Sequence, residues 1–383
     1  PVDWIFIDPA RRDGHGGKTI AISECEPDVS ALENLLLEKA SHVLVKLSPM
    51  LDLTLALHDL KHVQAAHVVS VNNECKELLD KPADVVLMNG FEDDFVPQGR
   101  TFAAKRKKAR AAMLNLANKL LGLTMSDDTL IVGTSGRYEF KNKGINVYLE
   151  SLNRLTRDKN LKKEVLAFIN VPGWVGDPRE DLVERLKSKE NFTTPLECPF
   201  ITHWLHNMSH DQVLDMMKYL GMSNSAESKV KVIFVPCYLD GKDGILNLEY
   251  YDLVLGNDLS VYPSYYEPWG YTPLESVAFH VPTITTDLAG FGLWVNSLKG
   301  RYCELKDGVK VIHRSDYNYS EVADVIKDTI SEFSGLPENV IKTMRKNAAD
   351  IAEKALWKHF IKYYYEAYDV ALHNAQKRLI MNS

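Results

Sequence analysis

Two glutamates, Glu267 and Glu275, lie eight positions apart in the aromatic stretch VYPSYYEPWGYTPLE of residues 261–275. A carboxylate can accept two hydrogen bonds at once, which suits it to the neighbouring hydroxyls of a sugar. Glu275 has a second interpretation, because a glutamate in a first helical turn is also a common capping residue. Glu267 lies between Tyr266 and Pro268 in a predicted loop, where no such structural role applies. We therefore expect Glu267 to contact a bound sugar.

The residues around Glu275 predict a helix that begins at an anion site. Thr272, Pro273 and Glu275 fit the N-cap, N1 and N3 positions of a capping box. The strand-like residues 259–264 come shortly before, so this helix would begin at the carboxyl edge of a parallel sheet. Free backbone N–H groups and the positive end of the helix dipole favour a negatively charged ligand there. We expect residues 269–273 to form a phosphate cradle.

Two cations, Arg137 and Lys143, follow another predicted strand in the sequence TLIVGTSGRYEFKNKGINVYLESL of residues 129–152. This sequence predicts a strand, a glycine turn, a charged loop and a helix with Asn142 as its cap. Cations at such an edge can stabilise the charge that a leaving diphosphate gains as its bond to a sugar breaks. The alternative is that both are ordinary solvated loop residues.

Apolar runs and helical patterns alternate along the chain, which predicts an α/β fold with a parallel sheet. The runs are nearly continuous in apolar residues, as in strands that are covered on both faces. Strands are predicted at residues 2–8, 42–48, 67–72, 83–89, 129–135, 165–172, 230–236, 259–264 and 281–287. Helices are predicted at residues 28–40, 101–122, 145–156, 179–188, 210–220, 320–333 and 338–374.

The bulk composition argues against several classes of protein. The chain has 383 residues and a net charge of −7, so no overall basic field points to nucleic acid. The basic run AAKRKKARAA, residues 103–112, lacks interleaved aromatics, and we interpret it as a solvated helix face. No apolar run approaches the roughly 18–20 residues of a membrane helix. Five scattered cysteines suit a reducing cytoplasm.

We expect neither a metal nor an organic cofactor. His203, His206 and His210 are spaced by three and four residues, which would suit a metal-binding face on a helix. No pattern of acidic ligands accompanies them, so a metal site is the weaker interpretation.

Longer motifs resemble the glycogen synthases of the animal and fungal type, which are retaining glycosyltransferases of family GT3 with a GT-B fold. YPSYYEPWGYTPLESVAFHVPTITTDLAGFG, residues 262–292, is similar to the signature of that family, and GRYEFKNKG, residues 136–144, is similar to its phosphate-binding loop. ADVVLMNGFEDDF, residues 83–95, and LHNMSHDQVLDMMKYLGMSNSAESKVKVIFVP, residues 205–236, also match in order and spacing. The resemblance covers roughly residues 78–375.

The resemblance implies that Arg137 and Lys143 hold a donor diphosphate and that Glu267 contacts the transferred glucose beside its anomeric carbon. The implied reaction adds glucose from UDP-glucose, or from ADP-glucose, to the non-reducing end of an α-1,4-glucan and retains the configuration. Cationic side chains and a helix N-terminus would supply the electrostatic stabilisation without a metal.

For donor binding, the resemblance implies that Glu275 holds the ribose hydroxyls and that Tyr250, with Tyr251 as a further candidate, stacks on the base. The backbone that would bind the distal phosphate belongs to Trp269, Gly270, Tyr271 and Thr272.

The chain also departs from the pattern of that family. A complete synthase has an N-terminal Rossmann-like domain that closes over the donor, and residues 1–77 do not match it, so we expect this chain alone to be weak or inactive. The family has a dense arginine cluster that senses glucose 6-phosphate. The matching helix here, at residues 340–357, carries only four cations: Lys342, Arg345, Lys346 and Lys354. This smaller number argues against a sugar-phosphate switch.

The first residues resemble a different family. WIFIDPARRDGHGGK, residues 4–18, places Asp8 and Pro9 at the end of a predicted strand and is similar to the DPP-type motif of class I S-adenosylmethionine-dependent methyltransferases. VLVKLSPMLD, residues 43–52, looks like the next strand and loop of the bacterial THUMP-like methyltransferases. The alternative is a simple strand-ending turn at Asp8-Pro9-Ala10. The cofactor loop of that family would lie upstream, so we expect no methyl transfer.

These resemblances predict two parts. Residues 1–77 would be a methyltransferase-like fragment, and residues 78–383 a donor-binding GT-B domain with a C-terminal crossover helix. We expect the join near Cys75–Ala83 and a fused or mis-assembled reading frame. The helix around residues 103–112 can serve subunit contacts in the synthase family, which would make the chain a homo-oligomer. Two other functions stay open: a methyltransferase-like protein, and a non-catalytic binder of a sugar nucleotide or a glucan.

Overall fold

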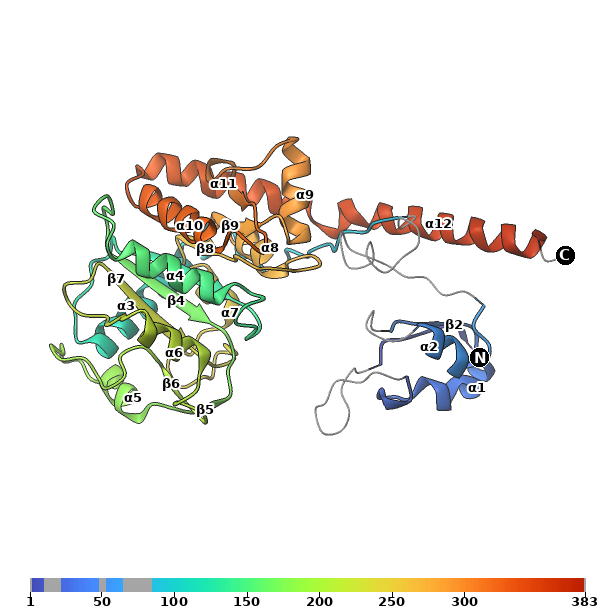
Figure 1. The fold of residues 1–383 in the computed structure, drawn as a ribbon, viewed down its shortest axis with the longest axis horizontal. Helices are drawn as coiled ribbons and strands as arrows, with labels where there is room; N and C mark the ends of the chain where they lie inside the picture. The colour runs from blue at the N-terminus through green and yellow to red at the C-terminus, as the bar shows by residue number, and fades with distance from the viewer. Residues whose placement is uncertain (1, 10–21, 48–52, 65–84, 382–383) are drawn as a thin grey trace. The chain divides into compact units, whose positions relative to one another are not determined.

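The computed structural model describes residues 2–9, 22–47, 53–64 and 85–381. These residues form two compact units, a small one that contains the first elements of the chain and a larger one over Leu87–Glu366, and each is described by itself (Figure 1). The predicted strand at residues 67–72 and the predicted join near Cys75–Ala83 lie outside the described residues. None of the described helices combines the length and the apolar character that spanning a membrane requires.

The small unit is built on two parallel strands. Its elements are β1 (Val2–Ile7), the short 3-10 helix η1 (Ile22–Glu24), α1 (Val29–Lys39), β2 (Ala40–Val45) and α2 (Leu53–Asp59). The prediction of strands covered on both faces is wrong here, because Trp4 and Phe6 on β1 are 64% and 61% exposed. Two strands and two short helices can bury only one face of such a sheet.

The larger unit contains a six-stranded sheet in which every strand pair is parallel, which confirms the predicted α/β Rossmann-like class. The strand order is β10-β9-β8-β3-β4-β7. The strands are β3 (Leu130–Ser135), β4 (Val165–Asn170), β7 (Val230–Val235), β8 (Leu259–Val261), β9 (Thr283–Thr286) and β10 (Val309–Ile312). Their residues are almost all buried, as the continuous apolar runs predict.

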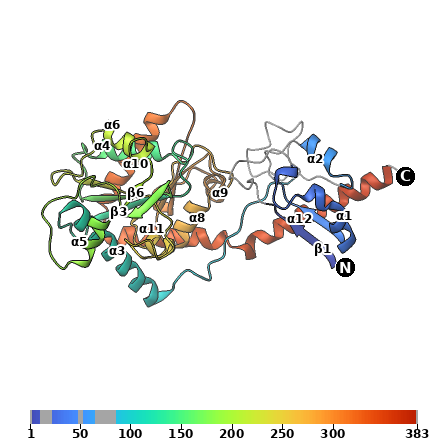
Figure 2. The same ribbon diagram turned by 90° about the horizontal axis from the view of Figure 1, so that it is seen from below.

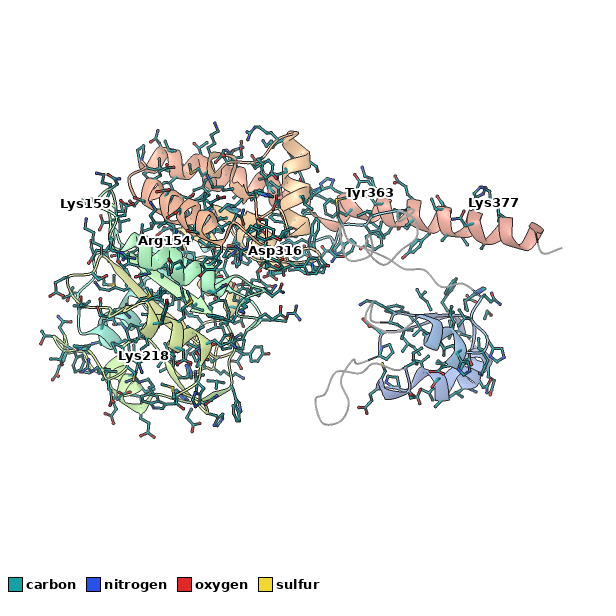
Figure 3. All side chains as sticks on the ribbon, in the orientation of Figure 1. Arg154, Lys159, Lys218, Asp316, Tyr363 and Lys377 are labelled. Carbon is teal, nitrogen blue, oxygen red and sulfur yellow. The ribbon has the colours of Figure 1, made fainter. Side chains whose placement is uncertain are left out.

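Helices cover both faces of this sheet (Figure 2). Leu130 and Val132 of β3 belong to one core, and Ile131 between them belongs to the other. The first face packs on α4 (Ile145–Leu155), α6 (Gln212–Tyr219) and α10 (Tyr319–Ser334). The second packs on α3 (Gly99–Leu121), α5 (Glu180–Lys187) and α7 (Tyr250–Val254). Arg154, labelled in Figure 3, joins α4 to α10 through Asp324 at 2.9 Å.

A third core cluster surrounds Trp269 and Phe291. It includes residues of α8 (Tyr271–Ala278), α9 (Gly290–Lys299), α11 (Glu338–Lys354) and the start of α12 (Trp357–Met381). The short 3-10 helix η2 (Leu305–Asp307) precedes β10. The single helix predicted at residues 338–374 is wrong, because α11 and α12 are separate. The backbone of Phe91 bonds to the residues between these two helices. Its N–H donates to Ala355 O at 3.0 Å, and its carbonyl accepts from Trp357 N–H at 3.1 Å.

Two short strands, β5 (Val175–Pro178) and β6 (His203–Leu205), form a separate antiparallel pair. They follow the carboxyl end of β4 and flank that of β7, since Ile201 pairs with Phe234. The strand predicted at residues 83–89 is wrong for its described part, because residues 85–89 have no regular structure.

Candidate functional site

The strand order changes direction between β3 and β8. The chain proceeds from β3 outward to β4 and β7, and then returns with β8 to the other side of β3. Such a change of direction opens a space beyond the carboxyl ends of the strands, where α/β proteins bind ligands. Arg137 and Lys143 follow β3, and Glu267 follows β8, so the sheet brings together residues that lie 124 positions apart in the chain.

Lys143 and Glu267 form a salt bridge between these two loops. Their side chains are 9% and 14% exposed. The other carboxylate oxygen of Glu267 accepts a hydrogen bond from Ser264 Oγ at 3.2 Å. Shielding from water makes the attraction between such charges stronger than in a surface pair. A cation suited to phosphate and a carboxylate suited to a sugar are therefore held side by side.

The backbone holds both residues of this pair in place. Glu267 donates its N–H to Leu288 O at 3.1 Å and accepts at its carbonyl from Gly290 N–H at 3.1 Å. Lys143 is followed by Gly144, which has a φ of +67° and begins α4. A Cβ at Gly144 would overlap the carbonyl oxygen of Pro263. The two loops thus approach each other at a distance that only glycine allows.

Helix α8 begins at Tyr271, with Gly270 as its N-cap. The predicted capping box is therefore wrong: Thr272 and Pro273 occupy the second and third helical positions, and Glu275 lies in the next turn. Gly270 has a φ of +106°, and this conformation lets the chain enter the helix two residues earlier than predicted. No side chain caps α8, which leaves its first backbone N–H groups for an anion. The phosphate cradle at residues 269–273 stays a prediction.

Two glycines show that the start of α8 and the salt bridge belong to one site. A Cβ on Gly270 would lie 3.7 Å from Glu267 Oε2. One on Gly136, directly after β3, would lie 3.8 Å from Lys143 Cε and 4.0 Å from Thr272 Cγ2. The turn after β3, the Lys143–Glu267 pair and the first residues of α8 therefore meet at one place.

Glu275 lies within a cluster of hydroxyl groups. Tyr251 donates to Glu275 Oε1 at 3.0 Å, and the hydroxyl of Tyr250 lies 2.8 Å from Ser135 Oγ. Burial raises the pKa of Glu275, hydrogen bonds from the two tyrosines oppose this, and the negative charge of Glu267 raises it further. Burial, and to a smaller degree the charge of Glu267, therefore make the charged form of Glu275 costly.

Three further predicted residues differ in their surroundings. The side chain of Arg137 is 77% exposed and pairs with Glu139 at 3.0 Å. The ring of Trp269 is buried against Phe291, with 6.0 Å between ring centres, so only its backbone can meet a ligand. Tyr250 lies half-buried, with its ring 5.2 Å from that of Tyr251. The predicted stacking of Tyr250 on a base stays a prediction.

Two interpretations made from the sequence are wrong. Asn142 does not cap α4, because Gly144 is the N-cap and the Asn142 amide donates to Glu139 Oε2 at 2.7 Å. The basic run in α3 is not solvated throughout, because Arg106 and Arg110 each reach Asp258 at 2.6 Å.

The three spaced histidines do not share a helix, since His203 lies in β6 and His206 and His210 lie in the following turn. A different group, His203, Cys237 and Asp243, places one possible ligand atom each within 4.8 Å of the others. These atoms are already engaged. His203 Nε2 contacts the carbonyl of Asp243 at 2.8 Å, and the carboxylate of Asp243 accepts three backbone N–H groups. Burial raises the pKa of Cys237 to about 12, which keeps it a thiol.

In the small unit, Asp8 follows β1 as predicted. Its carboxylate forms an ion pair with Lys46 Nζ at 2.6 Å. Residues 10–18 and 48–52 of the two methyltransferase-like motifs lie outside the described residues. The methyltransferase-like interpretation of residues 1–77 stays a prediction.

The fold and the site define an α/β protein with a cation, a carboxylate and a helix start at the switch point of a Rossmann-like sheet. The glycogen synthase family model matches residues 182–381. Glycogen [starch] synthase of Neurospora crassa is 27% identical over 305 residues, which cover 65% of this chain and 42% of that protein. Isoform 2 of Saccharomyces cerevisiae is 26% identical over 362 residues, which cover 78% and 51%. The chain belongs to the glycogen synthase family, and it spans about half the length of the curated relatives it matches.

Solved structures give weaker likenesses. The N-terminal domain of Candida albicans trehalose-6-phosphate phosphatase has a TM-score of 0.44 and 12% identity, and the match covers 75% of this chain and 49% of that one. A glycosyltransferase from Rickettsia africae has a TM-score of 0.41 and 16% identity, with 76% and 57% covered. These scores are too low to carry an argument, and the fold class rests on the parallel sheet itself.

Proposed function

We propose that this chain forms the donor-binding part of a glycogen-synthase-type glycosyltransferase. The reaction transfers glucose from UDP-glucose, or from ADP-glucose, to the non-reducing end of an α-1,4-glucan and retains the configuration. One observation carries the proposal: Lys143, Glu267 and the uncapped start of α8 at Gly270 meet at the switch point of the sheet. Membership of the glycogen synthase family supports it.

Lys143 and the first N–H groups of α8 bind the diphosphate of the donor. As the bond from phosphate to glucose breaks, negative charge collects on the leaving nucleoside diphosphate. A cation and N–H groups that are already oriented stabilise that charge more in the transition state than in the ground state. The burial of Lys143 strengthens this interaction. Arg137 assists from the same loop, where its exposed side chain can exchange Glu139 for a phosphate.

Glu267 contacts the transferred glucose, because its carboxylate lies beside both Lys143 and Gly270. Glu275 accepts hydrogen bonds from the ribose hydroxyls, with Tyr251 holding one of its oxygens. Tyr250 stacks on the base. No metal is required by this assignment, because cations and backbone dipoles supply the positive potential. We place the reaction in the cytoplasm, since Cys198, Cys237 and Cys303 carry free thiols, as in a reducing compartment.

Calorimetric titration of the whole chain tests the proposal. UDP-glucose, ADP-glucose and S-adenosylmethionine are titrated separately, and we expect one of the two sugar nucleotides to bind. Lys143→Ala should weaken that binding by roughly 10- to 100-fold, the scale of a lost charge-assisted hydrogen bond. The matched control is Lys159→Ala, an exposed lysine labelled in Figure 3, which should bind the donor normally.

Three outcomes would contradict the proposal. If neither sugar nucleotide binds, the donor site is wrong. If S-adenosylmethionine binds instead, the methyltransferase-like interpretation is favoured. If a donor binds equally well to the Lys143→Ala variant, the diphosphate lies elsewhere. Transfer of labelled glucose to glycogen then separates an enzyme from a non-catalytic binder.

A further inference from the structure

A row of hydroxyl groups follows the seam between β3 and β8 and leads to Glu275. Ser260 of β8 lies opposite Gly133 of β3, and Ser135 is the last residue of β3. This hydroxyl row consists of Ser276, Ser260, Tyr262, Ser135 and Tyr250. All of them except the half-buried Tyr250 are between 0% and 7% exposed. A buried hydroxyl is unfavourable unless it is hydrogen-bonded, and alanine or phenylalanine would fill the same space without it. The row therefore indicates a role beyond packing.

The hydroxyl row can be followed from its carboxylate end. Tyr250 is hydrogen-bonded to Glu275. The hydroxyl of Tyr250 lies 2.8 Å from Ser135 Oγ, and that atom lies 3.4 Å from the hydroxyl of Tyr262. An ionised carboxylate only accepts hydrogen bonds, so Tyr250 donates to Glu275. Since a hydroxyl has a single proton, Ser135 must donate to Tyr250, and Tyr262 must donate to Ser135.

The other half of the row continues in the same direction. Tyr262 is hydrogen-bonded to Ser260 and to Ser276. Ser276 donates its proton to Ser260 Oγ at 2.6 Å, which leaves Ser260 to donate to Tyr262. Asn257 Nδ2 also donates to Ser260 Oγ, at 3.3 Å. The row thus starts from an amide donor and ends on a carboxylate, and hydrogen bonds that share one direction strengthen each other.

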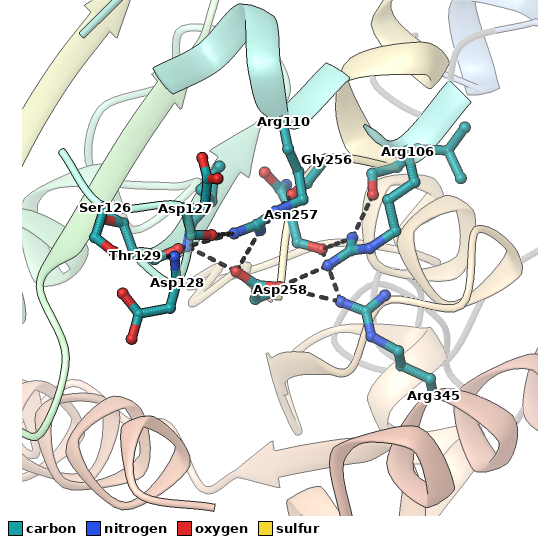
Figure 4. Close-up of polar contacts among 12 residues, drawn as sticks. Arg106, Arg110, Ser126, Asp127, Asp128, Thr129, Gly256, Asn257, Asp258 and Arg345 are labelled. Atoms are coloured by element: carbon teal, nitrogen blue, oxygen red, sulfur yellow. Dashed lines mark hydrogen bonds and ion pairs between the residues drawn. The ribbon is translucent and has the colours of Figure 1, made fainter. Parts of the chain in front are cut away.

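The row starts at the amino edge of the sheet, shortly before β8. The carbonyl of Asn257 accepts from Arg106 at 2.7 Å and from Arg345 at 3.1 Å (Figure 4). Arg106 belongs to α3 and Arg345 to α11, so two helices hold the first donor of the row in place. The hydroxyl row is therefore anchored at a fixed point of the sheet.

At its other end the row leaves Glu275 able to accept from a ligand. Tyr250 donates to this carboxylate, and Tyr251 donates to Oε1 at 3.0 Å. A carboxylate has about four acceptor positions, so about two remain, which two neighbouring hydroxyls such as those of a ribose can fill. The row also fixes the hydroxyl of Tyr250, and with it the angle of the ring that we propose to stack on the base.

We propose that Ser135 and Tyr262 are positioning residues for the nucleoside part of the donor. Neither contacts the donor in our assignment, and both act through Tyr250 and Glu275. Tyr262 donates to Ser135 and Ser135 donates to Tyr250, so removing either hydroxyl interrupts the row before it reaches the carboxylate. The inference rests on the proposed function for the identity of the ligand, and it assigns these two residues no part in binding the diphosphate.

A purely structural role predicts a different result. Hydroxyls that only satisfy each other would contribute the same stability at every pH, whereas hydroxyls that support the charge of Glu275 also lower its pKa. The neighbouring carboxylate, Glu267, is paired with Lys143. Burial raises the pKa of each tyrosine whose charge would act on Glu275, so these side chains stay neutral while Glu275 titrates: Tyr250, Tyr251, Tyr262 and Tyr271.

Two variants of the whole chain, Tyr262→Phe and Ser135→Ala, test the inference. Each is compared with the same variant that also carries Glu275→Gln, by urea denaturation at several pH values. The fall of this stability difference should move to higher pH in both variants, because an interrupted row donates less strongly to the charged carboxylate. The matched control is Tyr148→Phe, which should not move it. Tyr148 is fully buried in α4, and its hydroxyl donates to Val132 O at 3.2 Å, outside the row.

Calorimetric titration of the same variants measures the donor site. The affinity for the sugar nucleotide should fall about two- to tenfold in Tyr262→Phe and in Ser135→Ala, the scale of one lost hydrogen bond. Inorganic pyrophosphate has no nucleoside, so its affinity should not change. Tyr148→Phe should bind both ligands as the unaltered chain does.

The inference is supported if the two variants show the shift in pH and lose affinity for the nucleotide but not for pyrophosphate. If the shift appears while the unaltered chain binds no sugar nucleotide, the row still positions Glu275 and only the proposed function fails. The inference is overturned if both variants lose the same stability at every pH, or if they bind the nucleotide normally. Equal losses of nucleotide and pyrophosphate affinity would show a general loosening of the site and would overturn it as well.

Discussion

Two ionic clusters lie at opposite edges of the same sheet, and they differ in how fully their polar groups are engaged. At the carboxyl edge, Lys143 meets Glu267 one to one. At the amino edge, Asp258 lies directly before β8 and accepts the N–H of Ile131 in β3 at 2.9 Å. Figure 4 shows this second cluster, in which three guanidinium groups converge on Asp258: those of Arg106, Arg110 and Arg345.

The Asp258 cluster is a cross-link. Arg106 and Arg110 come from α3 and Arg345 from α11, so one carboxylate ties two helices to the start of β8. Although burial opposes the charge, Arg110, Arg106 and Arg345 hold the pKa of Asp258 below its ordinary value. A cavity of ≈ 620 Å³ lies beside the cluster, but these guanidinium groups already bind Asp258. Size alone therefore does not identify the donor site.

The Lys143–Glu267 pair has different surroundings. A Cβ added to Gly136 or to Gly270 would lie within 4.0 Å of this pair, and no side chain caps α8. A region lined by glycines, and by backbone N–H groups that have no side-chain partner, suits a ligand. A buried ion pair therefore indicates a binding site when the polar groups around it lack partners, and a structural link when all of them are paired.

The largest effect is expected for Asp258→Ala. Removing the carboxylate leaves three guanidinium groups close together without their counter-charge, and breaking a buried pair in this way costs about 3–5 kcal/mol of unfolding free energy. The loss of unfolding free energy is measured by urea denaturation. The control is Asp350→Ala, which breaks an exposed pair with Lys346 on α11 and should leave the midpoint nearly unchanged. Equal midpoints for the two variants would show that the cluster is no cross-link.

The next effect is expected for Gly144→Ala. Alanine is strained at a φ of +67°, and its Cβ would also overlap the carbonyl of Pro263, so the unfolding free energy should fall by about 1–3 kcal/mol. The loop that carries Lys143 must then move, and donor binding should weaken as well. Gly221→Ala is a matched control, because Gly221 has the same φ of +67° but open space around it. If both variants lose the same stability and both bind the donor normally, the close approach of the loops is unimportant.

A pH-dependent effect is expected for Glu275→Gln. Burial raises the pKa of Glu275 above the ordinary value of 4.5, so the folded protein holds this proton more tightly than the unfolded chain does. The stability from Glu275 is thus full below that ordinary value and is lost as the pH rises through the folded pKa. Glutamine does not titrate. The unfolding free energy of the unaltered chain, relative to Glu275→Gln, should therefore decrease as the pH rises above 4.5.

Glu353→Gln is a control of opposite sign for this measurement. A hydrogen bond from Lys358 lowers the pKa of Glu353, so its stabilisation is present at neutral pH and is lost as the pH falls. A Glu275→Gln difference that does not depend on pH, or that follows the sign of Glu353→Gln, would show that the Glu275 carboxylate is solvated and not enclosed.

Much of the sheet could be predicted from the sequence, and its edges could not. The runs at β3, β4 and β7 are long and apolar because both faces are covered. Strands β5, β6 and β10 were missed, since VGDP contains a glycine and a proline, and HWL and VKVI are not part of a longer apolar run. The exposed face of β1 was mistaken for a buried one, because apolar composition does not tell which faces are covered.

The candidate site could be predicted as residue types but not as a geometry. The carboxylates and cations were predicted at strand ends, which local patterns show. The pairing of Lys143 with Glu267 depends on the strand order, which no local pattern contains. The start of α8 was misplaced because a capping box was favoured over the positive φ of Gly270, and a glycine two residues before Thr272 was the available signal.

The smallest effect is expected for Tyr251→Phe, which removes the hydrogen bond to Glu275 Oε1 at 3.0 Å and leaves the ring stacked on Phe279. The loss should be about 0.5–1.5 kcal/mol of unfolding free energy. That hydrogen bond lowers the pKa of Glu275, so its removal should raise this pKa further, and the pH-dependent difference from Glu275→Gln should extend to higher pH. In the proposed donor site Tyr251 only positions Glu275, so we expect donor affinity to fall only slightly. A large loss of donor affinity would instead assign the hydroxyl of Tyr251 a direct contact with the donor.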